Sequence, residues 1–209
     1  GIAAARGLLT EGGGPVILRI ALGPETGQCC GGRVTLHVRI ADQAVLDERR
    51  TVEQRDADRE PVVMVYGAGH VGRALALALD PLPFRTRIVD ARPDELALVE
   101  GRRVERIADA PSRIAQAAPA GAAHVVLTHS HALDSLICAA LLETADFAYL
   151  GLIGSATKRA TFVRAFRSLG LPEAAIARLV CPIGGAAIRD KRPPVIAALV
   201  AAELLAVLA

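Results

Sequence analysis

The pattern of apolar and polar positions divides the chain at about residue 60. From residue 61 onward, short apolar runs of strand length alternate with longer stretches of helical length. This alternation predicts an α/β fold, a doubly wound Rossmann-like parallel sheet with helices on both faces. We expect strands near residues 62–66, 87–90, 104–107, 124–128 and 147–153, and helices near 73–79, 94–100, 112–118, 133–144, 156–167, 172–179 and 194–208.

The first 60 residues form a different pattern. Residues 3–9 indicate the end of a helix, and residues 15–22 and 33–40 indicate two strands, the second with clear alternation. Residues 47–60 are strongly charged, which is typical of an exposed linker. We therefore predict a smaller α+β domain over residues 1–60 and a Rossmann-like domain over residues 61–209.

A glycine turn with the spacing G-x-G-x-x-G follows the first apolar strand of the larger domain. Gly67 is expected to make the tight turn, Gly69 to let the backbone approach a pyrophosphate, and Gly72 to let the helix pack on the strand. Asp90 ends the second strand 18 residues after Gly72, where an acid that binds a ribose diol is expected. The alternative is a structural glycine turn that binds nothing.

Two further loops are expected beside this turn, because loops after the carboxyl ends of parallel strands meet at one crevice. The first holds His129, His131 and Asp134, groups suited to metal binding or proton transfer. It resembles only superficially the H-x-H-x-D-H run of binuclear zinc hydrolases, so a zinc site is not expected. The alternative reading is that one histidine caps a helix and Asp134 bonds a backbone amide.

The second loop, residues 151–159, indicates an anion site. Ser155 is the expected N-cap after Gly154, and Lys158 follows within the first turn. Cations there oppose the helix dipole and therefore suggest a bound anion. The alternative is that Lys158 and Arg159 are solvated side chains.

Four cysteines in 209 residues do not indicate a disulfide framework, which favours a reducing, cytoplasmic setting. Cys29 and Cys30 are adjacent in a glycine-flanked loop between the first two strands, so they are expected to be exposed thiols suited to soft metals or sulfur chemistry. The alternative is simple packing. Cys138 is expected to pack in a helix, and Cys181 is left undecided.

Composition excludes several classes of partner. The net charge is +2, only 3% of residues are aromatic and there is no Trp, so neither nucleic acid nor a membrane surface is expected as a partner. The longest apolar stretch, residues 195–209, is interrupted by Glu203 and is too short to span a bilayer. The chain begins without Met and without a signal pattern, so a longer native chain and no export are expected.

Five ordered motifs carry a family resemblance from about residue 22 to the C-terminus. They are residues 28–34 (with the sequence QCCGG), 66–72 (which includes His70), 128–134, 151–155 and 181–184. Together they resemble the XdhC family of xanthine dehydrogenase accessory proteins. The family's N-terminal Gly-Ser-x-Pro-Arg type of motif is not found, so the small domain is expected to be incomplete. Residues 190–194 look like a variant of the family's lysine-and-proline turn.

The resemblance implies a maturation factor rather than an enzyme, and no catalytic residue. Such a protein binds molybdenum cofactor (molybdopterin), promotes its sulfuration with a cysteine desulfurase, and delivers it to the molybdenum-binding subunit of xanthine dehydrogenase. By family analogy a homodimer is also expected. Cys29 or Cys30 would then ligate molybdenum, and the glycine turn with Ser155 and Lys158 would bind the phosphate.

In the same hypothesis His129 or His131 hydrogen-bonds the pterin or the oxo and sulfido groups. Two rival functions stay open at this point. One is an NAD(P)-dependent oxidoreductase, in which Asp90 favours NAD while Arg92 could accept a 2′-phosphate. The other is a nucleotide-sensing regulatory module without chemistry, in which the adjacent cysteines only pack.

Overall fold

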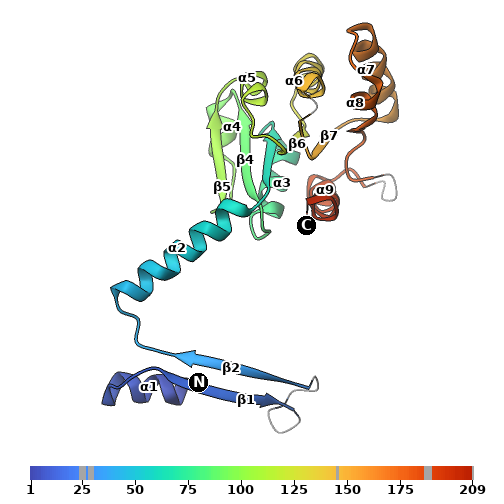
Figure 1. Ribbon diagram of the computed structural model, residues 1–209. Coiled ribbons are helices and arrows are strands. Elements are labelled where there is room, and N and C mark those ends of the chain that lie inside the picture. The colour runs from blue at the N-terminus through green and yellow to red at the C-terminus, as the bar shows by residue number, and fades with distance from the viewer. Residues whose placement is uncertain (24–26, 28–30, 145, 186–189, 209) are drawn as a thin grey trace. The chain divides into compact units, whose positions relative to one another are not determined.

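The computed structural model describes residues 1–23, 27, 31–144, 146–185 and 190–208, and divides them into two compact units (Figure 1). The first unit covers residues 1–56 and the second covers residues 57–209. The boundary therefore lies four residues before the one that the sequence pattern predicts, after residue 60. Gln28, Cys29 and Cys30 lie outside the described residues.

The first unit is built from a helix and a hairpin. Helix α1 (Ile2–Glu11) precedes strands β1 (Val16–Leu22) and β2 (Gly32–Val38), which pair antiparallel with Val16 opposite Val38 and Leu22 opposite Gly32. The helix and the two strands agree with the sequence prediction. The loop that holds the QCCGG sequence therefore connects two paired strand ends.

The charged stretch, which the sequence analysis predicts as an exposed linker, is helical, and this helix was not predicted. Helix α2 (Gln43–Arg59) has no buried residue, which is why it shows no apolar periodicity. Asp42 Oδ1 accepts a hydrogen bond from the Val45 amide at 2.9 Å, as an N-cap does. Arg49 and Glu53, one turn apart, form an ion pair at 3.5 Å. Local capping and charge pairs support this helix in place of a buried face.

The second unit contains a six-stranded parallel sheet with the strand order β5-β4-β3-β6-β7-β8. Counted along the chain, the order is third, second, first, fourth, fifth, sixth, which is the order of dinucleotide-binding folds. The predicted doubly wound sheet is confirmed. The short β8 was missed, because residues 172–179 were all expected to be helical. The strands are β3 (Val62–Tyr66), β4 (Arg85–Asp90), β5 (Val104–Ala108), β6 (Ala123–Val126), β7 (Tyr149–Leu152) and β8 (Leu179–Val180).

Helices cover both faces of this sheet, as strand β3 shows. Val63 and Val65 belong to one apolar cluster with α3 and α9, whereas Met64 and Tyr66 belong to another with α5 to α8. All five β3 residues are buried, which explains the unbroken apolar run in the sequence. The helices are α3 (His70–Leu79), α4 (Pro93–Ala97), α5 (Pro111–Gln116), α6 (His131–Thr144), α7 (Ala156–Ser168), α8 (Glu173–Ala177) and α9 (Pro193–Leu208).

Helix α9 is more apolar than the other helices of ten or more residues that the structure describes, and it packs against α3. It is 16 residues long. Among the described residues, no helix combines the length and the apolar character that crossing a membrane requires.

Candidate functional site

The glycine turn after β3 has the geometry that its sequence predicts. Gly67 has φ of 117°, and a Cβ there would lie 2.6 Å from the Leu127 carbonyl oxygen. A Cβ on Gly72 would lie 1.9 Å from the Gly67 carbonyl oxygen, so α3 approaches the turn too closely for any side chain. A Cβ on Gly69 would meet nothing within 4 Å. The backbone of Gly69 is therefore open to a ligand.

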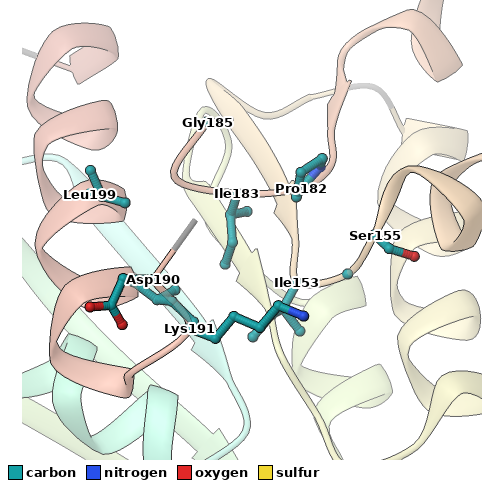
Figure 2. Close-up of a pocket in the computed structure, with 10 residues that line it drawn as sticks. Ile153, Ser155, Pro182, Ile183, Gly185, Asp190, Lys191 and Leu199 are labelled. Atoms are coloured by element: carbon teal, nitrogen blue, oxygen red, sulfur yellow. The ribbon is translucent and has the colours of Figure 1, made fainter. Parts of the chain in front are cut away.

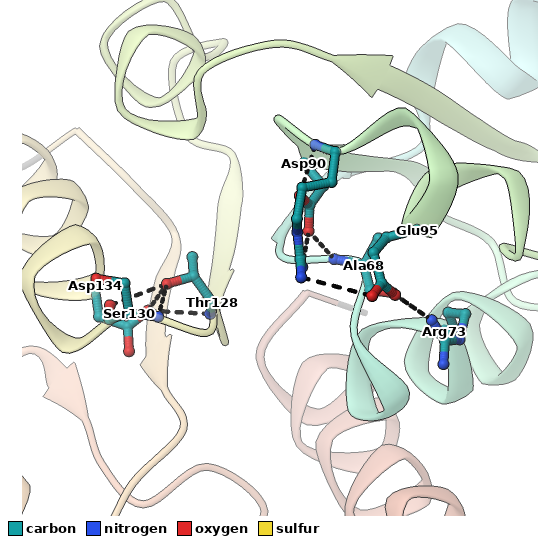
Figure 3. Close-up of polar contacts among 8 residues, drawn as sticks. Ala68, Arg73, Asp90, Glu95, Thr128, Ser130 and Asp134 are labelled. Atoms are coloured by element: carbon teal, nitrogen blue, oxygen red, sulfur yellow. Dashed lines mark hydrogen bonds and ion pairs between the residues drawn. The ribbon is translucent and has the colours of Figure 1, made fainter.

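Asp90 binds the glycine turn instead of pointing into free space (Figure 3). Its Oδ2 accepts hydrogen bonds from the Ala68 amide at 2.8 Å and from Arg92 Nη2 at 2.8 Å. Its Oδ1 accepts from the Arg92 amide at 3.0 Å and from Arg92 Nε at 2.9 Å. Burial would raise the pKa of Asp90, but these hydrogen bonds outweigh it and lower the pKa to about 2. The carboxylate is thus fully ionised and fully engaged.

A second pair of charges continues this network. Glu95 Oε2 lies 2.5 Å from Arg73 Nη1, and Glu95 Oε1 lies 3.6 Å from Arg92 Nη1. Arg73 Nη1 also donates to the Ala68 carbonyl at 3.1 Å. The first turn of α3 and the residues after β4 are therefore held together by alternating charges, as Figure 3 shows.

A cavity of about 330 Å³ lies where the strand order reverses between β3 and β6. Parallel sheets of this order bind their ligands at such a switch point. Four segments supply its walls: the three that the sequence predicts, the third through Ile153 alone, and the residues after β4, which were not predicted as part of this crevice. The described residues that line it are Gly69, His70, Val71, Arg92, Glu95, Leu127, Thr128, His129 and Ile153.

Asp134 and Lys158, both predicted as ligand contacts, bind each other. Lys158 Nζ lies 2.7 Å from Asp134 Oδ2 and donates to the Ile153 carbonyl at 2.9 Å. Asp134 Oδ1 accepts from the Thr128 amide at 3.0 Å and from Thr128 Oγ1 at 2.7 Å. The Asp134 side chain is completely buried. The backbone-bonding alternative for Asp134 is therefore the arrangement found, and the charge of Lys158 is already compensated.

Ser155 is the N-cap of α7, as predicted. Its Oγ accepts a hydrogen bond from the Lys158 amide at 3.2 Å. Gly154 lies against the Lys158 side chain, since a Cβ there would lie 2.7 Å from Lys158 Cδ. These two residues therefore shape the loop that carries Lys158.

The histidines of the 128–134 loop are both exposed but line different cavities. His129 lines the switch-point cavity together with the exposed His70. His131 lines a separate cavity of about 260 Å³ beside Lys158. The structure therefore places His129, and not His131, at the switch-point cavity.

A buried histidine was not predicted as part of any site. His124 in β6 lies with its Nδ1 2.9 Å from the Tyr66 hydroxyl, and the two rings stack with centroids 5.8 Å apart. Burial lowers the pKa of His124 to about 4, so the ring is neutral near pH 7. In the sequence, His124 stands out only by its position in an apolar strand, and that position predicts a packed side chain and not a ligand contact.

An apolar cavity of about 530 Å³ adjoins the switch-point cavity and shares Ile153 with it (Figure 2). Pro182 and Ile183 on one side and Leu199 of α9 on the other give it an aliphatic wall. Ser155, Asp190 and Lys191 lie at its edge, and Figure 2 shows the Lys191 side chain extending toward Ile153.

The described cysteines are buried. Cys138 is fully buried in α6, as predicted, and burial raises the pKa of its thiol. Cys181 is 9% exposed, with Sγ 3.9 Å from the Ser155 carbonyl oxygen, and burial raises the pKa of its thiol although Lys158 and Arg159 oppose the shift. Within the described part of the chain, no three His, Cys, Asp or Glu side chains gather as a metal site. The predicted metal ligands, Cys29 and Cys30, lie outside that part.

Comparison with known proteins gives a family match for the larger unit. The family model of the XdhC Rossmann domain matches residues 63–204. A crystal structure described as that of a xanthine dehydrogenase from Bacillus halodurans superposes with a TM-score of 0.72, over 98% of this chain and 78% of that one. The two sequences are 16% identical, so this likeness shows the fold alone. No curated protein matches the chain.

Proposed function

The chain belongs to the XdhC family, and from this premise we propose that it is a maturation factor of xanthine dehydrogenase. In this proposal it binds molybdenum cofactor, supports its sulfuration by a cysteine desulfurase, and inserts it into the molybdenum-binding subunit of the apo-enzyme. The observation that carries the proposal is the family match over a domain with an open cavity at its switch point.

The chemistry of the cavity suits the cofactor's phosphate. Several groups that line it can donate hydrogen bonds to a phosphate. They are the amides of Gly69, His70 and Val71 at the start of α3, the guanidinium of Arg92 and the ring of His129. The adjoining apolar cavity of about 530 Å³ has a size typical of pockets for a ring system. The residues of the switch-point cavity therefore supply donors for the phosphate, and the aliphatic wall of the adjoining cavity supplies a surface against which the face of a ring can pack.

The molybdenum ligand is proposed to be a thiolate of Cys29 or Cys30. The support is chemical, because thiolates are soft ligands and these residues are adjacent in a glycine-flanked loop. When bound, the cofactor supplies the molybdenum centre on which xanthine dehydrogenase depends. The residues of this chain bind, orient and release it.

Reconstitution of molybdenum-free xanthine dehydrogenase tests the proposal. The purified protein is incubated with molybdenum cofactor, a cysteine desulfurase and the apo-enzyme, and recovery of xanthine oxidation is measured. We expect recovery to depend on this protein and to fall in Cys29→Ala or Cys30→Ala. Cys138→Ala, a buried thiol outside the cavity, is the matched control and should retain recovery.

Direct binding separates this proposal from its rival. A nucleotide-sensing module is favoured by the strand order and the glycine turn, which are those of dinucleotide-binding folds. Cofactor and NAD(H) are therefore titrated side by side. Binding of NAD(H) alone, unchanged in both cysteine variants, would contradict the maturation role and favour the sensor.

A further inference from the structure

The Asp90 carboxylate has no free position for a ribose diol. A carboxylate accepts about four hydrogen bonds. Asp90 receives one from the Ala68 amide and three from Arg92, and only 4% of the residue is exposed. A diol could reach Asp90 only if Arg92 moved away and gave up both side-chain hydrogen bonds.

The other polar groups of the cavity favour an anion. Glu95 is the only acid among the described residues that line it, and Arg73 already pairs with its carboxylate at 2.5 Å. Arg92 donates to Asp90 through Nε and Nη2, and its Nη1 lies 3.6 Å from Glu95 Oε1, too far for a hydrogen bond. Among the described residues, the second Nη2 hydrogen and the Nη1 hydrogens therefore have no hydrogen-bond acceptor, and a ligand would compete with Glu95 only for the charge of Arg92. The Arg92 side chain is 39% exposed and lines the cavity, and His70 and His129 are exposed beside it. A ligand therefore meets donors, while the acceptor that a diol requires is occupied.

We propose that the switch-point cavity recognises a phosphate monoester through Arg92 and discriminates against ligands that offer only a ribose diol. Asp90 acts as a positioning residue, because its bidentate ion pair holds the guanidinium group of Arg92 in place. For molybdopterin, one of its two possible ligands, the inference rests on the proposed function. Phosphate monoesters occur both in molybdopterin, at its terminal phosphate, and in NADP, at its 2′-phosphate.

Two matched pairs of ligands test this recognition with the full chain. NADP⁺ and NAD⁺ differ only in the 2′-phosphate, and their affinities are measured by calorimetry. Form A, the fluorescent oxidation product of molybdopterin, is compared with its phosphatase-treated form by fluorescence titration. We expect at least one pair to show about a tenfold or larger preference for the phosphorylated member, the size of effect that charge-assisted hydrogen bonds give.

Variants at Arg92 connect the preference to this side chain. Arg92→Ala should abolish the preference and strengthen NAD⁺ binding, because Asp90 is then free to accept a diol. Arg92→Lys keeps the charge but loses the fork and should restore part of the preference. Arg113→Ala is the control, since Arg113 also pairs with an aspartate, Asp109, but at an exposed site that does not line the cavity.

The outcomes separate this inference from the proposed function. Equal binding of both members in both pairs, a preference for NAD⁺, or a preference that survives in Arg92→Ala would overturn the inference. If binding is equal in both pairs and Form A binds tightly with or without its phosphate, the inference fails while the maturation role stands. A preference within the NADP⁺ pair alone, without binding of Form A, would support the inference and contradict cofactor binding in this cavity.

Discussion

Lys158 Nζ lies 2.7 Å from Asp134 Oδ2, and this ion pair joins the first turn of α6, after β6, to the first turn of α7, after β7. The side chains of Lys158 and Asp134 are 10% and 0% exposed. Asp134 also accepts hydrogen bonds from the Thr128 amide and hydroxyl, so the ion pair belongs to a buried polar network. The pair fixes two loops that border the predicted site.

Removing one partner of this pair should destabilise the fold strongly. Lys158→Met leaves a buried, unpaired carboxylate, which costs about 3–5 kcal/mol. Denaturant unfolding measures the loss. Arg167→Ala breaks an exposed pair with Glu173 and should cost less than about 1 kcal/mol. A loss as small for Lys158→Met as for Arg167→Ala would show that the buried pair does not stabilise these loops.

Asp90 should make stability depend on pH in the acidic range. The pKa of Asp90 is about 2 in the folded chain, below the usual 3.8 of an aspartate, so the folded state favours the ionised form. A carboxyl group whose pKa is lower in the folded chain stabilises the fold at pH values above its pKa in the unfolded chain. For Asp90 this stabilisation is about 2 kcal/mol, and it is lost as the pH falls from about 4 through about 2. Unfolding free energies of the parent and Asp90→Asn should therefore converge over this range. A constant difference between pH 6 and pH 2 would contradict the assignment.

The two glycines at the start of α3 should respond differently to alanine. Gly72→Ala places a Cβ 1.9 Å from the Gly67 carbonyl oxygen and should cost about 3 kcal/mol. Gly69 has φ of −68° and open space around a Cβ. Gly69→Ala should therefore lower the free energy of unfolding by about 1 kcal/mol or less, because alanine is a poorer N-cap residue than glycine. Thermal unfolding measures both. Because Gly69 lines the cavity, its variant should weaken ligand binding more than its stability loss implies.

The described thiols should react slowly in the folded protein. Burial raises the pKa of both Cys138 and Cys181, and only the thiolate attacks a disulfide reagent. A Cys29→Ser/Cys30→Ser variant isolates these two residues. We expect Cys138 to react only after unfolding and Cys181 to react more slowly than a free thiol at pH 7.5. Rapid labelling of Cys138 in the native state would mean that α6 opens readily.

Regular patterns predicted the fold, but the partners of the charged residues were not predictable from them. The apolar run of β3 and the spacing of Gly67 and Gly72 each report a local physical constraint, so the sheet and its first turn could be predicted. The partner of Lys158 lies 24 residues earlier in the chain, and no periodicity reveals it. Helix α2 was missed because charge pairs and a cap, and no buried face, support it. The engagement of Asp90 by Arg92 likewise depends on side-chain rotamers, which spacing does not specify.

One aliphatic residue is common to the two cavities at the carboxyl edge of the sheet. Ile153 lines both, while its carbonyl oxygen accepts the Lys158 hydrogen bond that fixes its position. The two cavities thus have one aliphatic side chain in common, on a backbone position that Lys158 holds. A change in the size of this side chain would therefore alter the polar and the apolar cavity at the same time.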